Sequence, residues 1–533
     1  MTGRTVAVSF RAPMAALVVI TMVLASIYFG SGSPAEASEP INGGGSTWSA
    51  PAIAAWTSDV AREGITVNYQ GNVGSTAGRQ GYTAGTYDFA VSEIPFQAQY
   101  CTTPGQPNTC YDELTQPGLL ARPYVYMPIV AGGTSLLYNL PINGQPFTHL
   151  QLSPVTLTKI FTGGITNWDD PTIAAENPGV RFPDLKIQPV VRSDGAGTSY
   201  QFTAFMKYED PTDWQAFCER AGIQQNPCPP TSQFPYEALP NSEAEDGSSG
   251  VADWVSDSYN PGSIGYAEAA YGIEVGVPVV SLQNRAGSYV QPTAKAVAVA
   301  LTGAIINSDN TQNLLGVYSN PDPRAYPMSS YSYMIVPTTD AAPMDLSKGD
   351  TLGQFILFFL CQGQQQAAPL GYSPLPPNLV QIGFNAEQRI PGAPRPPPIR
   401  TCNDPTITGD FLAGIGTPVV AGHGGGAASG STSGGGSTRT SGVTERSVQR
   451  HAAAKHATVK TSHRQSFNAQ SSQAPVELAT SSPQLFGKAF RPMSEALLAL
   501  VIAITVGILV APRAAGSFSG LGRRRKPKSG DPG

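Results

Sequence analysis

The sequence predicts an α/β protein, and three observations support that class. Residues 41–400 alternate short strand-like runs with amphipathic runs, the order typical of strands followed by helices. Small, hydroxyl-rich loops join such runs at three places. The chain also has 533 residues, more than one hydrophobic core usually organises, so at least two folding units and non-globular segments are expected.

The composition separates an acidic globular middle from basic ends. Hydrophobic residues make up 41% of the chain and charged residues 13%, while 57 Gly and 48 Pro indicate many turns. Residues 41–410 carry 16 Lys and Arg against 31 Asp and Glu, a formal charge of −15. A protein that neutralises many nucleic-acid phosphates does not have this charge, so we expect no nucleic-acid partner. Any anion would have to be bound by local dipoles.

The six cysteines all lie in this middle region. In an oxidising compartment, their proximity along the chain favours three disulfides, Cys101–Cys110, Cys218–Cys228 and Cys361–Cys402. Proximity leaves the other pairings open. A zinc site is disfavoured and no metal is expected, because the chain has no C-x-x-C motif and His149 is the only histidine in residues 41–410.

Residues 1–40 have the order of a secretory signal peptide. Arg4 and Arg11 precede an apolar run at 14–29, and small residues follow it, with cleavage expected near Ala35 or Ala37. A retained N-terminal anchor is the alternative. No cysteine follows the apolar run, so a lipid-anchored cleavage signal is missing.

A transmembrane helix is expected at 494–512. Residues 496–511 are almost uninterruptedly apolar, although a bilayer needs about 20 such residues. The basic tail at 513–533 places the C-terminus in the cytoplasm by the positive-inside rule, and the large domain on the extracellular face of the cell membrane. A buried core helix is the alternative.

Residues 411–490 are expected to form a flexible Gly/Ser-rich linker. This segment lacks apolar periodicity and cannot bury enough surface to offset the entropy of ordering. Its histidines have irregular spacing, which favours a solvated linker over a metal site. They are His423, His451, His456 and His463.

Three strand-loop-helix junctions carry groups suited to an anion. In each, hydroxyls and free backbone N–H groups gather at a predicted helix start, which favours negative charge. A glycine-rich turn at 43–45 precedes the first helix, at 52–61. A strand at 67–70 leads through a second loop to a helix from Arg79, and a strand at 187–191 leads through a third loop to a helix at 202–206. The first of these loops covers residues 46–51, the second 71–78 and the third 192–199.

Arg192 adds a charge that can pair with an oxyanion through two N–H groups, and Asp194 can orient that guanidinium. Taken singly, each loop is typical of an ordinary helix cap, and the Arg-Asp pair of a surface ion pair. Three such junctions together favour one shared anion site.

Several motifs then occur in a known order. They are GGGSTWSAP, VNYQGNVGSTAG, TYDFAVSEIPF, NWDDPTIAAENPG, VVRSDGAGTS, PGSIGYAEAAYG and YPMSSYSYMIVP. Over roughly residues 41–390 the chain resembles the phosphate-binding subunit of the bacterial Pst phosphate ABC transporter, a type II periplasmic binding protein. The resemblance does not extend to the linker or the C-terminal helix.

This resemblance implies a two-lobed fold that closes on inorganic phosphate and docks on ABC permease subunits in the membrane. Lobe 1 would be discontinuous, 41–130 and 322–400, with lobe 2 at 131–321 between them. No catalytic residue and no cofactor is implied. The implied phosphate ligands are Ser46, Thr47, Trp48, Ser75, Glu93, Arg192, Ala196, Gly197 and Thr198, with Asp194 behind Arg192.

Glu93 has a specific part in this scheme. Phosphate near neutral pH still carries a proton that a buried carboxylate can accept, whereas sulfate has none and would face an unpaired negative charge. The family usually has Asp in place of Glu93 and Ser in place of Ala196. These departures leave open a changed affinity or another oxyanion.

Two other function classes are weighed. A hydrolase of phosphate esters is disfavoured, because no G-x-S-x-G elbow or P-loop occurs and His149 alone offers no clear partner for a nucleophile. A surface-anchored interaction or sensing protein that reuses the binding fold remains the alternative, suggested by the unusual tether, Glu93 and Ala196.

Overall fold

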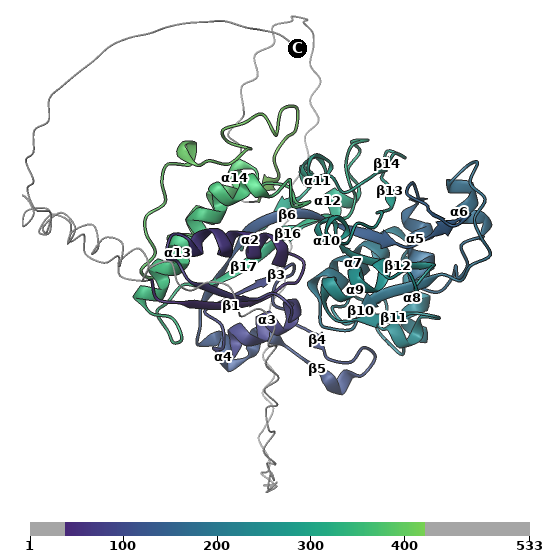
Figure 1. Cartoon of the computed structure of the whole chain (residues 1–533). Coiled ribbons are helices and arrows are strands. Elements are labelled where there is room, and N and C mark those ends of the chain that lie inside the picture. Colours follow the sequence, from purple (N-terminus) through teal and green to yellow (C-terminus); the bar gives the residue numbers. More distant parts are fainter. Residues whose placement is uncertain (1–37, 422–533) are drawn as a thin grey trace, which may run out of the picture. The chain divides into compact units, whose positions relative to one another are not determined.

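The structure is a computed structural model that describes residues 38–421 (Figure 1). Its largest element is an eight-stranded sheet with both parallel and antiparallel pairs. In spatial order the strands are β11 (Glu243–Glu245), β10 (Gln188–Arg192), β12 (Ser263–Glu268), β6 (Tyr124–Tyr138), β17 (Ser329–Pro337), β3 (Phe89–Ser92), β1 (Ile41–Gly45) and β2 (Val67–Gln70). The α/β class predicted from the sequence is confirmed.

Strand β6 joins two halves of this sheet. Its first residues, 124–133, pair with β17, and its last residues, 134–138, pair with β12. All of its residues except Tyr124 are buried, as expected for a central strand with a continuous apolar run. We call β1, β2, β3, β17 and the helices packed on them lobe 1, and β10, β11, β12 and their helices lobe 2.

Pro128 lies inside β6, where it has no N–H to offer the ladder. The register between β6 and β17 shifts at this point, because Ser332 pairs with Val130 but Tyr333 pairs with Pro128. Ile129 is therefore the extra residue of a β-bulge. Prolines within sheets are confined to edges and bulges, so the bulge is what allows a proline in a central strand.

The glycine-rich segment at 43–45 belongs to β1, and the turn expected there is wrong. Gly43 pairs with Phe89 of β3, and the Phe89 ring occupies the space that a Cβ on Gly43 would need. A Cβ on Gly44 would lie 2.5 Å from Cζ of Tyr87. Gly43 and Gly44 make room for aromatic rings over the strand. In the sequence alone, glycines with this role look the same as glycines of a turn.

The helices divide between the lobes. In lobe 1, α3 packs on β1 and β3, and α13 packs on α2 and β1. In lobe 2, α9 packs on all three strands, and α7 contacts α5 and α8. The helices of lobe 1 are α2 (Ala50–Ala61), α3 (Gly74–Thr83), α4 (Pro117–Leu120), α13 (Leu346–Leu360) and α14 (Pro377–Glu387); those of lobe 2 are α5 (Pro154–Phe161), α6 (Pro171–Glu176), α7 (Gly197–Glu209), α8 (Pro211–Arg220), α9 (Gly247–Ser256) and α10 (Ala269–Val275).

Several helix starts have a clear local cause. Ser153, Asp170 and Asp210 each accept a backbone hydrogen bond from the first turn of α5, α6 and α8. A proline follows each of them at the first helical position, where its missing N–H costs nothing. The capped starts fix where the chain turns back along the sheet.

The segment after α10 contacts both lobes. Helix α11 (Ala294–Leu301) packs on β6 and β17, and Gln312 of β16 (Gln312–Asn313) donates from Nε2 to the Tyr331 carbonyl at 2.8 Å. In α12 (Leu315–Tyr318), Tyr318 packs instead on Phe205 of α7. The lobe boundaries at 130 and 322 therefore stay a prediction.

The described chain ends on a short strand, β18 (Val419–Val420), that pairs in parallel with β15 (Ile305–Ile306). Residues 411–421 thus extend the folded part beyond the expected linker start. The rest of the linker, the transmembrane helix and basic tail at 494–533, and the signal segment up to 37 lie outside the described residues. Within 38–421, no helix has the length and apolar character needed to cross a bilayer.

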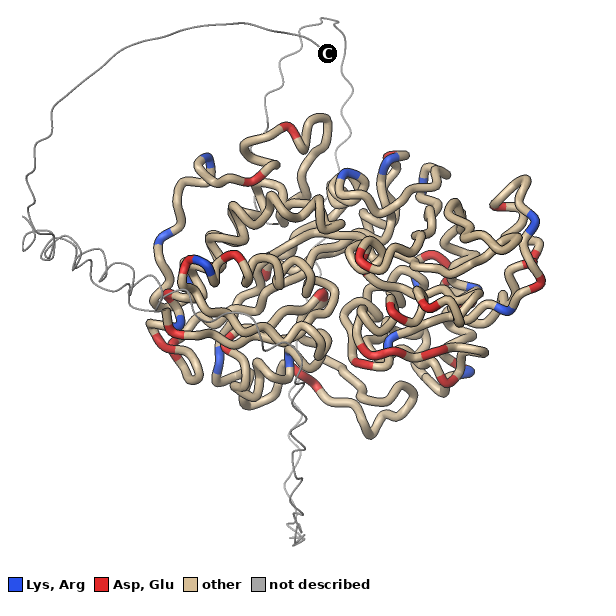
Figure 2. Tube along the Cα trace, in the orientation of Figure 1, with Lys and Arg blue, Asp and Glu red and all other residues tan. Residues whose placement is uncertain are grey.

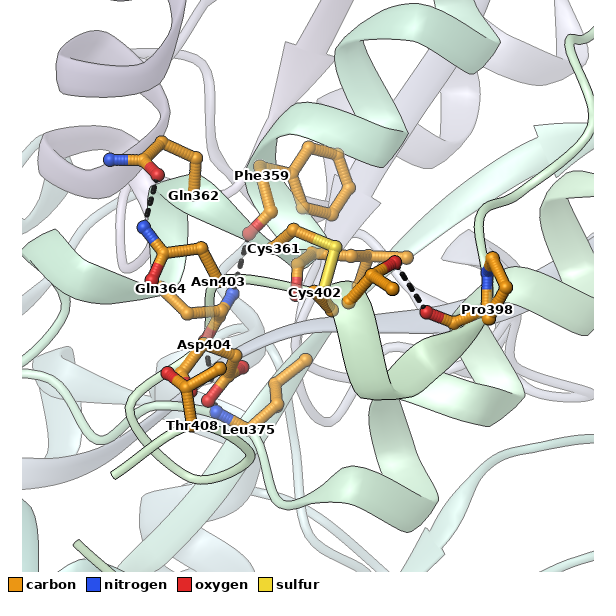
Figure 3. Close-up of a disulfide and its surroundings, with 12 residues drawn as sticks. Phe359, Cys361, Gln362, Gln364, Leu375, Pro398, Cys402, Asn403, Asp404 and Thr408 are labelled. Atoms are coloured by element: carbon orange, nitrogen blue, oxygen red, sulfur yellow. Dashed lines mark hydrogen bonds between the residues drawn. A yellow bond between two sulfur atoms is a disulfide. The ribbon is translucent and has the colours of Figure 1, made fainter. Parts of the chain in front are cut away.

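All three expected disulfides are present, so their predicted pairing is confirmed. Figure 3 shows Cys361 bonded to Cys402, which ties the end of α13 to the segment that follows α14. Beside it, Asn403 donates to Oε1 of Gln362, and Gln364 donates to the Phe359 carbonyl at 2.9 Å. These contacts fix the C-terminal part of lobe 1.

Candidate functional site

The predicted site residues follow the carboxyl ends of parallel strands. Ser46 comes after β1, Glu93 after β3, and Arg192 ends β10. In open α/β sheets, ligands bind at this edge, where the strands end and helices begin. Figure 2 marks acidic and basic residues along both lobes, and acidic residues predominate.

Glu93 receives hydroxyl hydrogen bonds from three different elements. Ser46 donates to Oε1, Ser75 in the first turn of α3 donates to Oε2 at 2.5 Å, and Ser332 of β17 donates to Oε1 at 3.3 Å. From lobe 2, Gln201 of α7 donates to the Glu93 carbonyl at 3.0 Å. Glu93 is only 1% exposed. Burial raises its pKa, while the hydrogen bonds from Ser46 and Ser75 and the charge of Arg192 oppose that rise.

Helix α3 begins at Gly74, five residues earlier than the sequence predicted. Ser75 therefore lies in the first helical turn and not in the loop. Thr76 N–H donates to the Gly195 carbonyl of lobe 2 at 3.0 Å. The start of α3 thus meets the loop that precedes α7.

Gly197 is held against the Glu93 carboxylate across the two lobes. A Cβ at this position would lie 2.9 Å from Ser75 Oγ and 3.0 Å from Glu93 Cβ, and nearer still to Glu93 Oε2. Only a residue without a side chain allows this approach. The first turn of α7 therefore meets the first turn of α3 and the end of β3.

Arg192 is a fully buried guanidinium with its donors committed on two sides. Its Nε donates to Asp194 Oδ1 at 2.6 Å and one terminal nitrogen donates to Asp194 Oδ2 at 2.5 Å. The other terminal nitrogen donates to Ser248 Oγ at 3.1 Å. Burial alone would lower the pKa of Arg192, but Asp194 and Glu268 raise it above its ordinary value, so Arg192 stays charged.

Ser248 is a site residue that the sequence reasoning missed. Its Oγ lies 3.0 Å from Thr47 Oγ1 of lobe 1, and its N–H donates to the same Thr47 oxygen at 3.2 Å. Ser248 lies at the start of α9, after Asp246 and Gly247. This junction has the same small, hydroxyl-rich character as the other three, a signal that could have identified it.

Glu268 is a second missed residue. It ends β12, is 1% exposed, and its Oε1 accepts from Ser248 Oγ at 3.2 Å. Its Oε2 is buried and has no hydrogen-bond partner among the described residues. Burial raises the pKa of Glu268 to about 8, although Arg192 acts in the opposite direction. No spacing pattern in the sequence marks this carboxyl.

Two tyrosines hold the backbone of the first loop. Tyr271 of α10 donates to the Thr47 carbonyl at 2.8 Å, and Tyr372 donates to the Trp48 carbonyl at 2.6 Å. The Trp48 ring itself packs edge-on against Tyr372 in the core. A role for the Trp48 backbone in binding stays a prediction.

Ala196 corrects one expectation. Its N–H was expected to face an anion, but it donates to the Ser232 carbonyl of lobe 2 at 3.0 Å. Ala196 is the extended residue before α7, and that conformation turns its N–H away from the helix start. Thr198 behaves differently, because its buried Oγ1 has no partner in the described part of the chain.

The structure thus gathers the predicted residues into two adjoining groups. One contains Ser46, Ser75, Glu93 and Gly197; the other contains Thr47, Arg192 and Asp194, together with Ser248 and Glu268. Ser46 of the first group and Thr47 of the second are consecutive residues, which places the groups side by side. Within residues 38–421, no cluster of three or more histidine, cysteine or acidic residues is arranged to hold a metal. The arrangement provides a guanidinium, hydroxyls and three carboxyls, one of which, Asp194, pairs with the guanidinium. This set is suited to a protonated oxyanion.

Comparison with known proteins gives consistent matches. A family model described as a PBP superfamily domain matches residues 31–362. The phosphate-binding protein PstS of Xylella fastidiosa is 33% identical over 344 residues, which cover 64% of this chain and 83% of the relative. PstS of Pasteurella multocida is 31% identical over 362 residues, which cover 67% of this chain and 93% of the relative. A solved phosphate-binding protein from Stenotrophomonas maltophilia is 18% identical, with a TM-score of 0.45, and covers 72% of this chain and 100% of that chain.

Proposed function

The chain belongs to the PBP superfamily and within it to the PstS family of phosphate-binding proteins, and on that premise we propose that it captures inorganic phosphate outside the cytoplasm for an ABC-type importer. The relatives carry binding-protein names, and we propose no catalytic role and no cofactor. The ligand would lie between the lobes, at the two groups of residues described above.

One observation supports this proposal most directly. A buried guanidinium, Arg192, lies within reach of hydroxyls from both lobes, since Ser248 connects it to Thr47. Thr198 Oγ1 is buried in the first turn of α7, directly after Gly197, and has no partner among residues 38–421. Buried hydroxyls are nearly always hydrogen-bonded, so an orphaned hydroxyl at a helix start fits an oxyanion ligand.

Glu93 would select among oxyanions. In the proposed complex, its carboxylate accepts the proton that hydrogen phosphate carries, and Ser46 and Ser75 keep donating to that carboxylate. Arg192, Thr47, Thr198 and the N–H of Gly197 donate to the remaining oxygens. Sulfate offers no proton, so a negatively charged sulfate oxygen would face the negatively charged Glu93 carboxylate with no hydrogen bond between them. The longer Glu in place of the usual Asp is accommodated by three hydroxyl donors around its two oxygens.

Lobe closure would follow from this arrangement. Ser248 and Gly197 belong to lobe 2, whereas Thr47 and Ser75 belong to lobe 1, so binding groups meet only when the lobes are together. β6 runs through the junction, since it pairs with β17 of lobe 1 and β12 of lobe 2, and it is suited to act as the hinge. The closed form would then dock on the ABC permease subunits.

We also propose that the protein is held at the cell surface by its C-terminus. The support is sequence alone: the apolar segment 496–511, the basic tail after it and the polar linker before it. Membrane fractionation of the full-length chain, compared with a chain that ends at 490, tests this arrangement. Release of the shortened chain into the medium is expected, and equal membrane retention of both chains would contradict the tether.

The binding proposal is tested by calorimetric titration of the purified full-length chain. After removal of bound ligand by dialysis, phosphate and arsenate are expected to bind and sulfate is not. Absence of binding with all three anions would favour an interaction or sensing protein that reuses the fold. Tighter binding of sulfate than of phosphate would point to a different oxyanion.

A further inference from the structure

Glu268 is a buried carboxyl at the site whose charge the proposed phosphate complex has not yet accounted for. One of its oxygens accepts from Ser248 and the other has no partner among the described residues. A buried, half-satisfied carboxylate is costly, because neither water nor a donor replaces its lost hydration. The protonated, neutral form of the same carboxyl loses far less hydration free energy on burial.

The charged and titratable groups around Glu268 offer little compensation for a negative charge. Arg192 of β10 is the basic group that acts most strongly on it, and this guanidinium is already paired through two contacts with Asp194. Glu93, after β3, is a second carboxyl, and its charge raises the pKa of Glu268. Tyr271 of α10 and Tyr372 have pKa values raised by burial, so both remain neutral through the alkaline range.

A count of formal charges shows the consequence for ligand binding. If Glu93 and Glu268 were both ionised, three carboxylates including Asp194 would surround one guanidinium before any ligand arrived. A dianion entering that closed space would meet strong repulsion, since like charges interact through a low local dielectric. With a proton on Glu268, the carboxyl is neutral and can also donate a hydrogen bond. Burial acts in the same direction, raising the pKa of this group to about 8.

We propose that Glu268 is a positioning residue that must carry a proton for the site to accept dianionic phosphate, so that capture of the ligand takes up one proton at this carboxyl. The proton comes from solvent while the lobes are apart, and no other bond forms or breaks. The proposal deepens the proposed function of phosphate capture and rests on it. It makes Glu268, acting through Ser248 and Arg192, the group that sets the pH range of binding.

The direction of the pH effect follows from linkage. With the lobes apart, water solvates Glu268 and its pKa is lower than in the closed form; with phosphate bound, the neighbouring dianion raises it further. Between these two values the complex holds one more proton than the free protein. Affinity for phosphate therefore falls about tenfold for each pH unit through this window, which includes about pH 8.

The test is calorimetric titration of inorganic phosphate into the full-length chain between about pH 8 and about pH 9.5, where the ligand is dianionic throughout. Each titration is repeated in two buffers with different ionisation enthalpies, which gives the number of protons taken up. For the unmodified chain we expect about a tenfold loss of affinity per pH unit and uptake approaching one proton. Glu268→Gln preserves the shape of the side chain and is expected to change less than about twofold per pH unit, with no uptake.

Glu387→Gln is the matched control. Glu387 ends α14, is also buried, and has a pKa raised by burial to about 7, but it shares no hydrogen bond with the site. This variant is expected to keep the pH profile of the unmodified chain. A loss of the profile here would show that any buried carboxyl produces it, and would overturn the assignment to Glu268.

The remaining outcomes separate this proposal from the function on which it rests. Equal slopes for the unmodified chain and Glu268→Gln would overturn the role of Glu268 while phosphate binding stands. Failure of the unmodified chain to bind phosphate at any pH would instead overturn the proposed function. If Glu268→Gln does not fold, the unmodified chain still decides. Equal binding enthalpies in the two buffers would mean that no proton is taken up, and would contradict the proposal.

Discussion

The hydroxyl of Thr47 lies 3.0 Å from the hydroxyl of Ser248, although the two residues are 201 positions apart and belong to opposite lobes. Ser248 also accepts from Arg192 at 3.1 Å, so one serine side chain links lobe 1 to the guanidinium of lobe 2. Because a hydroxyl oxygen has two lone pairs, it can accept from both partners while its proton is donated to Glu268. This relationship makes Ser248 the first target for mutation.

Ser248→Ala is expected to weaken phosphate binding about tenfold. The change removes the acceptor for one Arg192 nitrogen and the partner of Thr47, and a hydrogen bond to a charged group contributes about 1.5–3 kcal/mol. Calorimetry measures the effect. Ser249→Ala is the matched control, because this neighbouring serine is exposed. Equal affinities of the two variants would contradict the role given to Ser248.

Gly197→Ala is expected to weaken phosphate binding while leaving the separate lobes folded. The new methyl group would meet Ser75 and Glu93 across the lobe junction, so closure would require a shift of backbone. Thermal unfolding without ligand should change little, whereas the stabilisation by added phosphate should largely disappear. Gly164→Ala, where the nearest neighbour is 3.4 Å away, controls for adding a methyl group. Unchanged stabilisation by phosphate in Gly197→Ala would show that the junction is not this close.

Glu93→Gln is expected to reduce the preference for phosphate over sulfate. The neutral amide keeps the size of the side chain but removes the charge that repels a fully ionised anion, and it adds a donor. Competition between sulfate and phosphate measures this preference. The prediction is a gain in sulfate affinity of at least about tenfold, since burying unpaired like charges costs several kcal/mol. Continued exclusion of sulfate would mean that another group selects the anion.

Part of this site could be predicted from the sequence because its groups are local. The loop from Arg192 to Thr198 contains a strand end, an ion pair and a helix start within a few residues. The strand end and the ion pair form as expected, whereas α7 begins at Gly197, five residues before the expected helix at 202–206. Ser46 and Ser75 follow the same rule, although α3 begins at Gly74 and not at Arg79.

Other features depend on long-range packing and gave no local signal. The glycines at 43–45 look like a turn, but the rings of Phe89 and Tyr87 lie over Gly43 and Gly44, and the Val91 carbonyl occupies the space that a Cβ on Gly45 would need. Ala196 uses its N–H for Ser232, a partner 36 positions away that sequence order does not place nearby. Glu268 becomes a site residue only because β12 ends beside β10, a consequence of strand order in the sheet.

The most direct measurement is phosphate titration of Arg192→Ala beside the unmodified chain, with Arg324→Ala as the control because Arg324 pairs with Asp322 on the exposed surface. The account predicts that Arg192→Ala no longer binds phosphate measurably, while Arg324→Ala binds like the unmodified chain and circular dichroism shows all three folded. Phosphate affinity within about twofold of the unmodified chain for a folded Arg192→Ala would contradict the account, because the buried guanidinium would then not hold the anion.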